Sequence, residues 1–207
     1  MLIKKNINYS KYIFWFSVLL IWIISTFIDR IWWNFYSNTP SWDQADYLNS
    51  AFDHARSLSF LGNDGSFDLS SFLDKSPKIP PFASIVNGAV IAFAGDPPHK
   101  AAWSLSIWNG FFIFNIASWG LYLRGTKFAF VCVLISAFSP FLFHLRTDYV
   151  LELPLLSVIT FYLFHLGRWS DDSCGGKWIQ VIIASIACSF SLLIKQSSLL
   201  VIIPSLL

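Results

Sequence analysis

Residues 81–95 read PFASIVNGAVIAFAG, and this stretch decides how the rest of the chain is arranged. It is apolar, but it offers only about 14 residues before the next polar group, whereas a helix needs about 17 or more to cross a bilayer core. Asn87 and Gly88 also interrupt it. We therefore expect a short helix that lies on the membrane surface or re-enters the membrane, without crossing it.

Composition places the whole chain in a membrane. Hydrophobic residues make up 55% of the 207 residues and charged residues only 13%, against a charged share of roughly 25% in soluble domains. The formal net charge is +2, and the chain has no basic run of the kind that nucleic-acid surfaces carry. These observations exclude a nucleic-acid-binding protein and favour contact with membrane lipids.

The remaining apolar runs predict the number of spans. Residues 12–28 form an uncharged run, and bulky Phe27 and Ile28 followed by Asp29 replace the small residues of a signal-peptide cleavage site, so we interpret the run as a retained first span. Later apolar runs cover 101–123, 128–145, 149–167, 178–194 and the residues from 199 onward. We predict an all-α polytopic membrane protein with about five to six transmembrane helices. A long outer loop, residues 29–100, carries short interfacial helices.

Residues 1–207 resemble the N-terminal module of a longer protein, because the last apolar run has no polar flank. Basic residues between the runs predict the orientation. If 81–95 does not cross, the short loops on one side hold most of them, which makes that side cytoplasmic: Lys4, Lys5, Lys11, Arg124, Lys127, Arg168 and Lys177. The loop 29–100 and the link 144–148 then share the outer side. If 81–95 did cross, Asp43 and Asp148 would face opposite compartments.

A first polar cluster lies in the outer loop, in the sequence TPSWDQADY at 39–47. Ser41 followed three residues later by Gln44 is a capping-box pattern, and it predicts a short helix on the membrane that begins at Ser41. Apolar residues follow at helical spacing: Tyr47, Leu48, Ala51, Phe52, Ala55 and Leu58. Asp43 is then either a catalytic carboxylate or a first-turn acid that stabilises the helix dipole by roughly 0.3–1 kcal/mol.

A second polar cluster, Arg146, Asp148 and Glu152, separates two apolar runs. Pro154 fits the first turn of the next helix, so one interpretation is that Glu152 caps this helix. Arg146 and Asp148 would then form an ion pair at the interface. Ionisable groups at membrane depth are costly and are often functional. Both interpretations stay open.

Two lysines are candidates for contact with a phosphate. Lys195 lies at the outer end of an apolar run, where it either extends its ammonium to the interface or binds an anionic lipid headgroup. Lys78 is either a solvated loop residue or a phosphate ligand. The four histidines are scattered without metal-ligand spacing, and the chain has no glycine-rich phosphate loop.

The order of these motifs resembles the integral membrane glycosyltransferases of the C superfamily. The nearest branch is similar to the dolichyl-phosphate-mannose protein mannosyltransferase family (glycosyltransferase family 39) and its bacterial relatives, including the lipid A aminoarabinose transferases. Residues 43–47, DQADY, are similar to the first-loop motif, and 78–82, KIPPF, to a later loop element. RTDYVLELPLL from 146 resembles the second outer loop, and LLIKQSSLLVIIP from 192 a later lysine-containing element.

The resemblance implies transfer of a sugar from a polyprenyl-phosphate-linked donor to a protein, lipid or glycan acceptor on the outer face of the membrane. In a bacterial inner membrane this site would face the periplasm. Asp43 corresponds to the catalytic aspartate, with Glu152 or Asp148 as the second acid. The resemblance makes Lys78, Lys195 and Arg146 candidate ligands of the donor phosphate, and Tyr47 and Asp46 further substrate-binding residues.

Gln44 departs from the family pattern, because a glutamate often follows the aspartate. No cofactor is firmly expected, and a divalent metal stays open. Two alternatives remain on the sequence: a transporter or flippase subunit, whose carboxylates would bind an ion or substrate near the bilayer midplane, and an inactive fragment of the glycosyltransferase.

Overall fold

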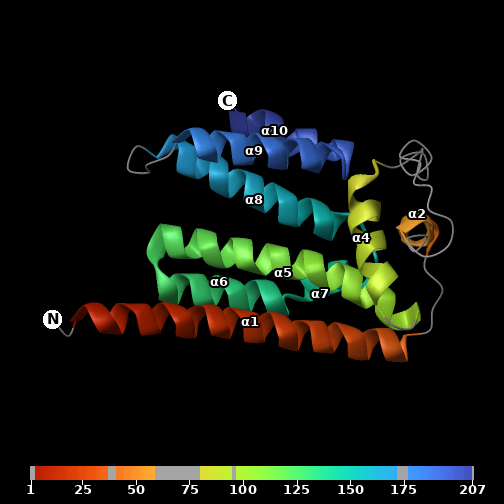
Figure 1. Ribbon diagram of the computed structural model, residues 1–207, viewed down its shortest axis with the longest axis horizontal. Coiled ribbons are helices and arrows are strands. Elements are labelled where there is room, and N and C mark those ends of the chain that lie inside the picture. Colours follow the sequence, from red (N-terminus) through yellow and green to blue (C-terminus); the bar gives the residue numbers. More distant parts are fainter. Residues whose placement is uncertain (1–2, 37–40, 59–79, 95–96, 172–176, 207) are drawn as a thin grey trace.

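A computed structural model describes residues 3–36, 41–58, 80–94, 97–171 and 177–206 (Figure 1). The described residues form helices and connecting turns without a β-strand, which confirms the all-α class. In chain order these are α1 (Ile3–Phe35), α2 (Trp42–Leu58), α4 (Phe82–Phe93), α5 (Pro97–Arg124), α6 (Thr126–Phe138), α7 (Pro140–Thr147), α8 (Glu152–Ser170), α9 (Lys177–Leu192), the 3₁₀ turn η2 (Gln196–Ser198) and α10 (Leu199–Leu206).

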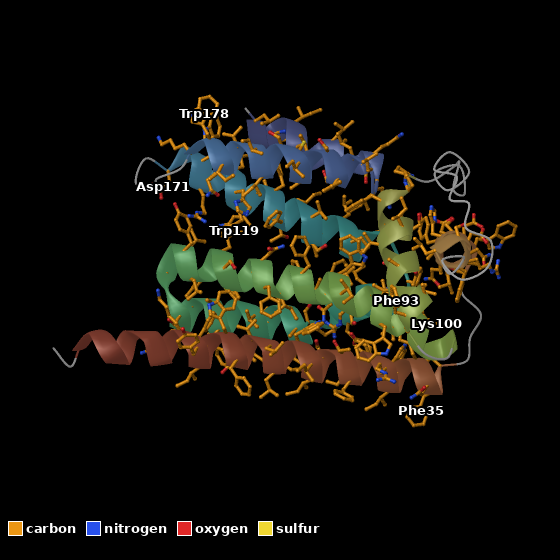
Figure 2. The ribbon with its side chains drawn as sticks, in the orientation of Figure 1. Phe35, Phe93, Lys100, Trp119, Asp171 and Trp178 are labelled. Carbon is orange, nitrogen blue, oxygen red and sulfur yellow. The ribbon has the colours of Figure 1, made fainter. Side chains whose placement is uncertain are left out.

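The long helices lie side by side, and α4 crosses one end of them (Figure 1). In that view α1, α6, α5, α8 and α9 follow one another across the bundle, while α2 is seen end-on beyond α4. Helix α2 packs on α4, and α4 packs on α5. Side chains near the α4 end include Phe93 and Lys100, whereas Asp171 and Trp178 lie toward the other end (Figure 2).

Helix α1 is an integral part of this bundle. The Trp22 indole donates a hydrogen bond to the Ser106 carbonyl at 2.8 Å, and the Asn109 amide donates to Ser25 Oγ at 3.0 Å, which ties α1 to α5. Among the described residues, 11–35 form a helix that is long and apolar enough to cross a bilayer, and only 33% of its most apolar window is buried. A second such segment results if the bent pair α6 and α7 is counted as one. The predicted crossings by α5, α8 and α9 stay predictions.

Helix α4 confirms the short helix expected at 81–95, with 12 residues. The two residues that interrupt its apolar run make its contacts. Asn87 Oδ1 accepts a hydrogen bond from the Trp108 indole of α5 at 2.6 Å. Gly88 faces α2, where an added Cβ would lie 2.7 Å from the His54 Cβ and 2.8 Å from the Ala51 carbonyl oxygen. Asn87 and Gly88 therefore hold α4 between α5 and α2.

The run 128–145, which we predict to be one span, consists of two helices, α6 and α7, bent by 53°; together they are long and apolar enough for one broken span. Pro140 is the first residue of α7. Proline lacks the N–H that would continue the helix, and its ring clashes with the preceding turn, so the break occurs there. At the other end of α6, Gly120 of α5 packs on Ala129 so closely that an added Cβ would lie 2.6 Å from the Ala129 Cα.

Candidate functional site

Glu152 and Lys195 form an ion pair at the end of the bundle crossed by α4. Lys195 Nζ donates a hydrogen bond to Glu152 Oε1. Glu152 is the first residue of α8, and Lys195 has extended backbone between α9 and η2. The Phe82 N–H donates to the Leu193 carbonyl at 3.1 Å, which fixes the start of α4 to the same place. The side chains are 36% exposed for Lys195 and 43% for Glu152, so a ligand can reach both.

The start of α2 adds acidic groups to this pair. Burial raises the pKa of the Tyr47 phenol above its ordinary value; the Lys195 charge opposes this shift, and the charges of Asp43, Glu152 and Asp46 add to it. The hydrogen bond to Glu152 raises the pKa of Lys195, against the effect of burial, with further contributions from Glu152, Tyr47 and Asp43. The charges of these five residues, from α2, α8 and the segment after α9, influence one another. We call them the outer cluster, after the predicted outer loop that contains α2.

Gln44 has a local role at the start of α2. Its side-chain Oε1 accepts a hydrogen bond from the Ser41 N–H at 3.1 Å, which is the glutamine half of the predicted capping box. Asp43, in the same first turn, is exposed. The helix end is therefore capped by Gln44, and the carboxylate of Asp43 is left accessible at the surface of the cluster.

Arg146, predicted as a phosphate ligand, lies in a buried ion pair. Its Nε donates to Asp29 Oδ2 at 2.8 Å, and its Nη1 donates to the Ala137 carbonyl at 2.9 Å. The side chains are 3% and 4% exposed for Arg146 and Asp29. This pair joins α7 to α1 and satisfies a carbonyl near the break between α6 and α7. With these contacts, Arg146 has the position of a structural residue.

Asp148 is the other candidate for the second acid, and it points to a different partner. Its Oδ2 lies 2.9 Å from the Nε2 of His144, one turn earlier in α7. Tyr149 follows with φ of 53°, a left-handed conformation that non-glycine residues rarely adopt. Its ring is buried and its hydroxyl contacts Ser104 Oγ at 3.5 Å. The contacts therefore pair Glu152 with Lys195 and Asp148 with His144.

Lys78 lies outside the described residues. Within the described ranges, no three histidine, cysteine, aspartate or glutamate side chains gather into a potential metal-binding group.

An apolar cavity of about 330 Å³ lies between α4, α5, α8 and α9. It begins close to the outer cluster: Phe82 stacks on Phe190 with ring centroids 4.2 Å apart, and Val158 follows Glu152 by six residues, about 9 Å along α8. The lining is entirely hydrophobic: Phe82, Trp108, Phe111, Val158, Phe161, Ile183, Ile186, Ala187 and Phe190. Charged groups thus lie at one end of a site whose interior suits hydrocarbon.

The sequence alone predicts neither the cavity nor the partner of Arg146. The cavity is formed by four helices whose inward faces cannot be matched from periodicity alone. A signal for the ion pair was present, because Asp29 ends the first apolar run and charged groups in such positions are usually paired.

The chain was compared with protein-family models, curated proteins and solved structures, and none of them matches it.

Proposed function

We propose that this chain is a multi-pass membrane protein that belongs to the catalytic part of a glycosyltransferase, with a polyprenyl-phosphate-linked sugar as donor. The observation that carries the proposal is the outer cluster next to an apolar cavity of about 330 Å³. A polyprenyl-phosphate sugar has the matching chemistry, since it joins a polar, charged head to a hydrocarbon chain.

Membrane placement is supported by the exposed surface of the helices. Large apolar side chains are exposed on the outer faces of α1, α6, α9 and α10, including Phe16 at 66%, Ile135 at 66%, Trp178 at 82% and Leu200 at 79%. Soluble monomers rarely expose such contiguous apolar surface, whereas a bilayer accepts it. A multi-pass arrangement in a bacterial inner membrane, with the outer cluster toward the periplasm, is the form of this placement that fits the basic loops.

In the proposed reaction, Asp43 acts as the general base. It takes the proton of an acceptor hydroxyl as the oxygen attacks the anomeric carbon, and the bond from that carbon to the donor phosphate breaks. The acceptor is a protein, lipid or glycan. Lys195 stabilises the negative charge that develops on the leaving polyprenyl phosphate. An ammonium group has three donors, so the bond to Glu152 leaves others for the phosphate.

Glu152 orients Lys195 in this scheme, and Tyr47 and Asp46 contact the substrates beside them. Lys78 is a further phosphate ligand on the sequence resemblance. We assign no metal, because the scheme needs none and Gln44 replaces the glutamate that would be one possible metal ligand.

Replacement of Asp43 tests the proposal. Asp43→Asn removes the base but keeps the shape, so transfer from a polyprenyl-phosphate sugar in detergent or proteoliposomes should fall by 10²-fold or more. Binding of polyprenyl phosphate should persist. Asp53→Asn, the same change on the same helix at an acid paired with Arg56, is the matched control and should keep activity. Full transfer by Asp43→Asn would refute the assignment.

Ala187→Phe supplies the complementary variant. Ala187 is 3% exposed and lines the cavity, so a phenyl ring there should weaken donor binding while leaving the acceptor side intact. Ile182→Phe, at a residue of α9 that is 52% exposed, controls for the added ring. Unchanged donor affinity in Ala187→Phe would separate the cavity from the donor site.

A transporter or flippase subunit is the second candidate, and the buried Asp29–Arg146 pair favours it, because buried ionisable groups in membrane proteins often belong to ion or substrate pathways. Against this candidate, the two charges are already paired with each other, and Arg146 also donates a hydrogen bond to the Ala137 carbonyl. Substrate transport that survives Asp43→Asn would favour this candidate.

A further inference from the structure

A groove of about 390 Å³, distinct from the apolar cavity described above, lies between α5 and α6. It is at the opposite end of the bundle from the outer cluster. Trp119, which lines it, is on the side of the molecule that holds Asp171 and Trp178 (Figure 2). Other lining residues are Leu123, Phe128, Cys132, Ile135 and Ser136. The groove is almost wholly apolar and opens to the outside. Its lining therefore suits a hydrocarbon chain.

Two cationic residues lie next to Phe128, a lining residue of this groove: Arg124 in space and Lys127 in sequence. The Arg124 guanidinium lies 5.8 Å from the ring centroid of Phe128, and Lys127 precedes Phe128 in the chain. Both cationic residues are exposed. Asp171, an acid near this end, is engaged by the Tyr122 hydroxyl. The rim therefore offers two positive charges to a ligand that reaches the groove.

The turn between the helices fixes these charges relative to the groove. Gly125 has φ of 80°, a conformation that side-chain-bearing residues rarely adopt, and it joins α5 directly to α6. Close packing of Gly120 on Ala129 sets the distance between the two helices. The groove and its rim thus belong to one rigid helical hairpin.

We infer that this hairpin binds an anionic phospholipid, with one acyl chain in the groove and the phosphate at Arg124 and Lys127. The charge of the rim selects the headgroup, and the apolar lining selects the hydrocarbon. Basic residues near a membrane surface contribute about fivefold each to the binding of anionic lipid. The inference rests on the membrane placement proposed above and is independent of glycosyl transfer.

Native mass spectrometry of the detergent-solubilised chain tests this site, with phosphatidylglycerol and phosphatidylcholine of identical acyl chains as probes. We expect tighter binding of phosphatidylglycerol, by about 25-fold for two cations. Arg124→Gln/Lys127→Gln should reduce its affinity to that of phosphatidylcholine. Lys4→Gln/Lys11→Gln, which removes the same charge from the N-terminal part of α1, should keep the preference.

Ser136→Phe fills the groove without changing the charges and should weaken both lipids, with helix content unchanged by circular dichroism. Equal binding of the two lipids to the unaltered chain would overturn the inference, as would a preference that survives Arg124→Gln/Lys127→Gln. Disulfide cross-linking of Cys132 between two chains in lipid would assign the groove to a second copy and also overturn it. A chain that stays in solution without detergent would instead refute the membrane placement.

Discussion

At the scale of single residues, Gln44 shows how much local sequence could predict. The spacing of Ser41 and Gln44 indicated a capping box, and the Gln44 side chain does accept the Ser41 N–H. Capping depends on neighbours within one turn, so it can be predicted without the fold. Gln44, which departs from the glycosyltransferase pattern, therefore has a structural role as a helix cap. The carboxylate of Asp43 beside it is exposed.

Because of Lys195, the free energy of unfolding should decrease as the pH becomes alkaline. Its folded-state pKa lies above the ordinary 10.5 because of Glu152. A group that binds its proton more tightly when folded stabilises the protein fully below 10.5, and this contribution is lost as the pH rises through the folded pKa. Tyr47, raised from 10.0, acts in the same direction.

We therefore expect the midpoint of thermal unfolding to fall between pH 9 and 11.5, by less than about 4 °C, because both partners are partly exposed and such pairs contribute about 1 kcal/mol or less. Scanning fluorimetry in detergent measures it. The decline should be shallower in Glu152→Gln, and an identical slope in both proteins would contradict the role of the pair.

Arg146 shows where residue-level prediction stopped. The family resemblance makes it a candidate phosphate ligand, but its partner Asp29 lies 117 residues away in the sequence. No local pattern connects the two. Asp148 and Glu152 are both candidates on the sequence: the contact of Asp148 with His144 is local to one helical turn, whereas the contact of Glu152 with Lys195 depends on how the helices pack.

At the scale of helices, the contact of α4 with α2 positions the first acidic group of the outer cluster. Gly88 lets the two backbones approach, and a side chain there would meet backbone atoms of α2. The sequence indicated only that Gly88 interrupts an apolar run. Its function in packing followed from the arrangement of the two helices.

Gly88→Ala should lower the free energy of unfolding by roughly 1–3 kcal/mol, an amount typical of overpacking. The midpoint of thermal unfolding should fall with it. The substitution should also reduce any activity that depends on Asp43. Gly167→Ala is the matched control, since an added Cβ there meets no atom within 4 Å and alanine favours a helix. Equal stability of the two variants would show that the α2–α4 contact tolerates a side chain.

The buried pair between α1 and α7 predicts a strong coupling. Arg146→Met or Asp29→Leu alone leaves a buried charge unpaired, which should cost about 3–5 kcal/mol of unfolding free energy. The double variant should recover much of that loss, because no charge is left unpaired. A double-mutant cycle from denaturant unfolding in mixed micelles measures this, and additive losses would contradict the coupling.

At the scale of the whole molecule, the sequence predicted the helices better than their connections. Length and apolarity indicate helices wherever the runs are uninterrupted, so α1, α5, α8 and α9 lie where they were expected. The sequence shows a continuous apolar run across Pro140, where the structure has a break between α6 and α7. Proline signals a kink but does not give its angle, which depends on the helices packed around it.

Topology is the prediction that belongs to this scale. In a chain whose native cysteines are replaced by serine, Asp43→Cys and Asp148→Cys should both react with a membrane-impermeant maleimide from the outer side of intact cells. Lys127→Cys should react only after permeabilisation. Labelling of positions 43 and 148 from opposite sides would show that 81–95 crosses the membrane, and no shared site could then form.

The outer cluster also sets an order of events during synthesis. Asp43 precedes Lys195 by 152 residues (195 minus 43), and chains grow at about 5–20 residues per second, so α2 leaves the ribosome on the order of 10 s before Lys195. Helix α2 cannot meet the end of α9 until then. Until then its apolar face lies at the membrane surface or on α4, and the segment after α9 completes the cluster.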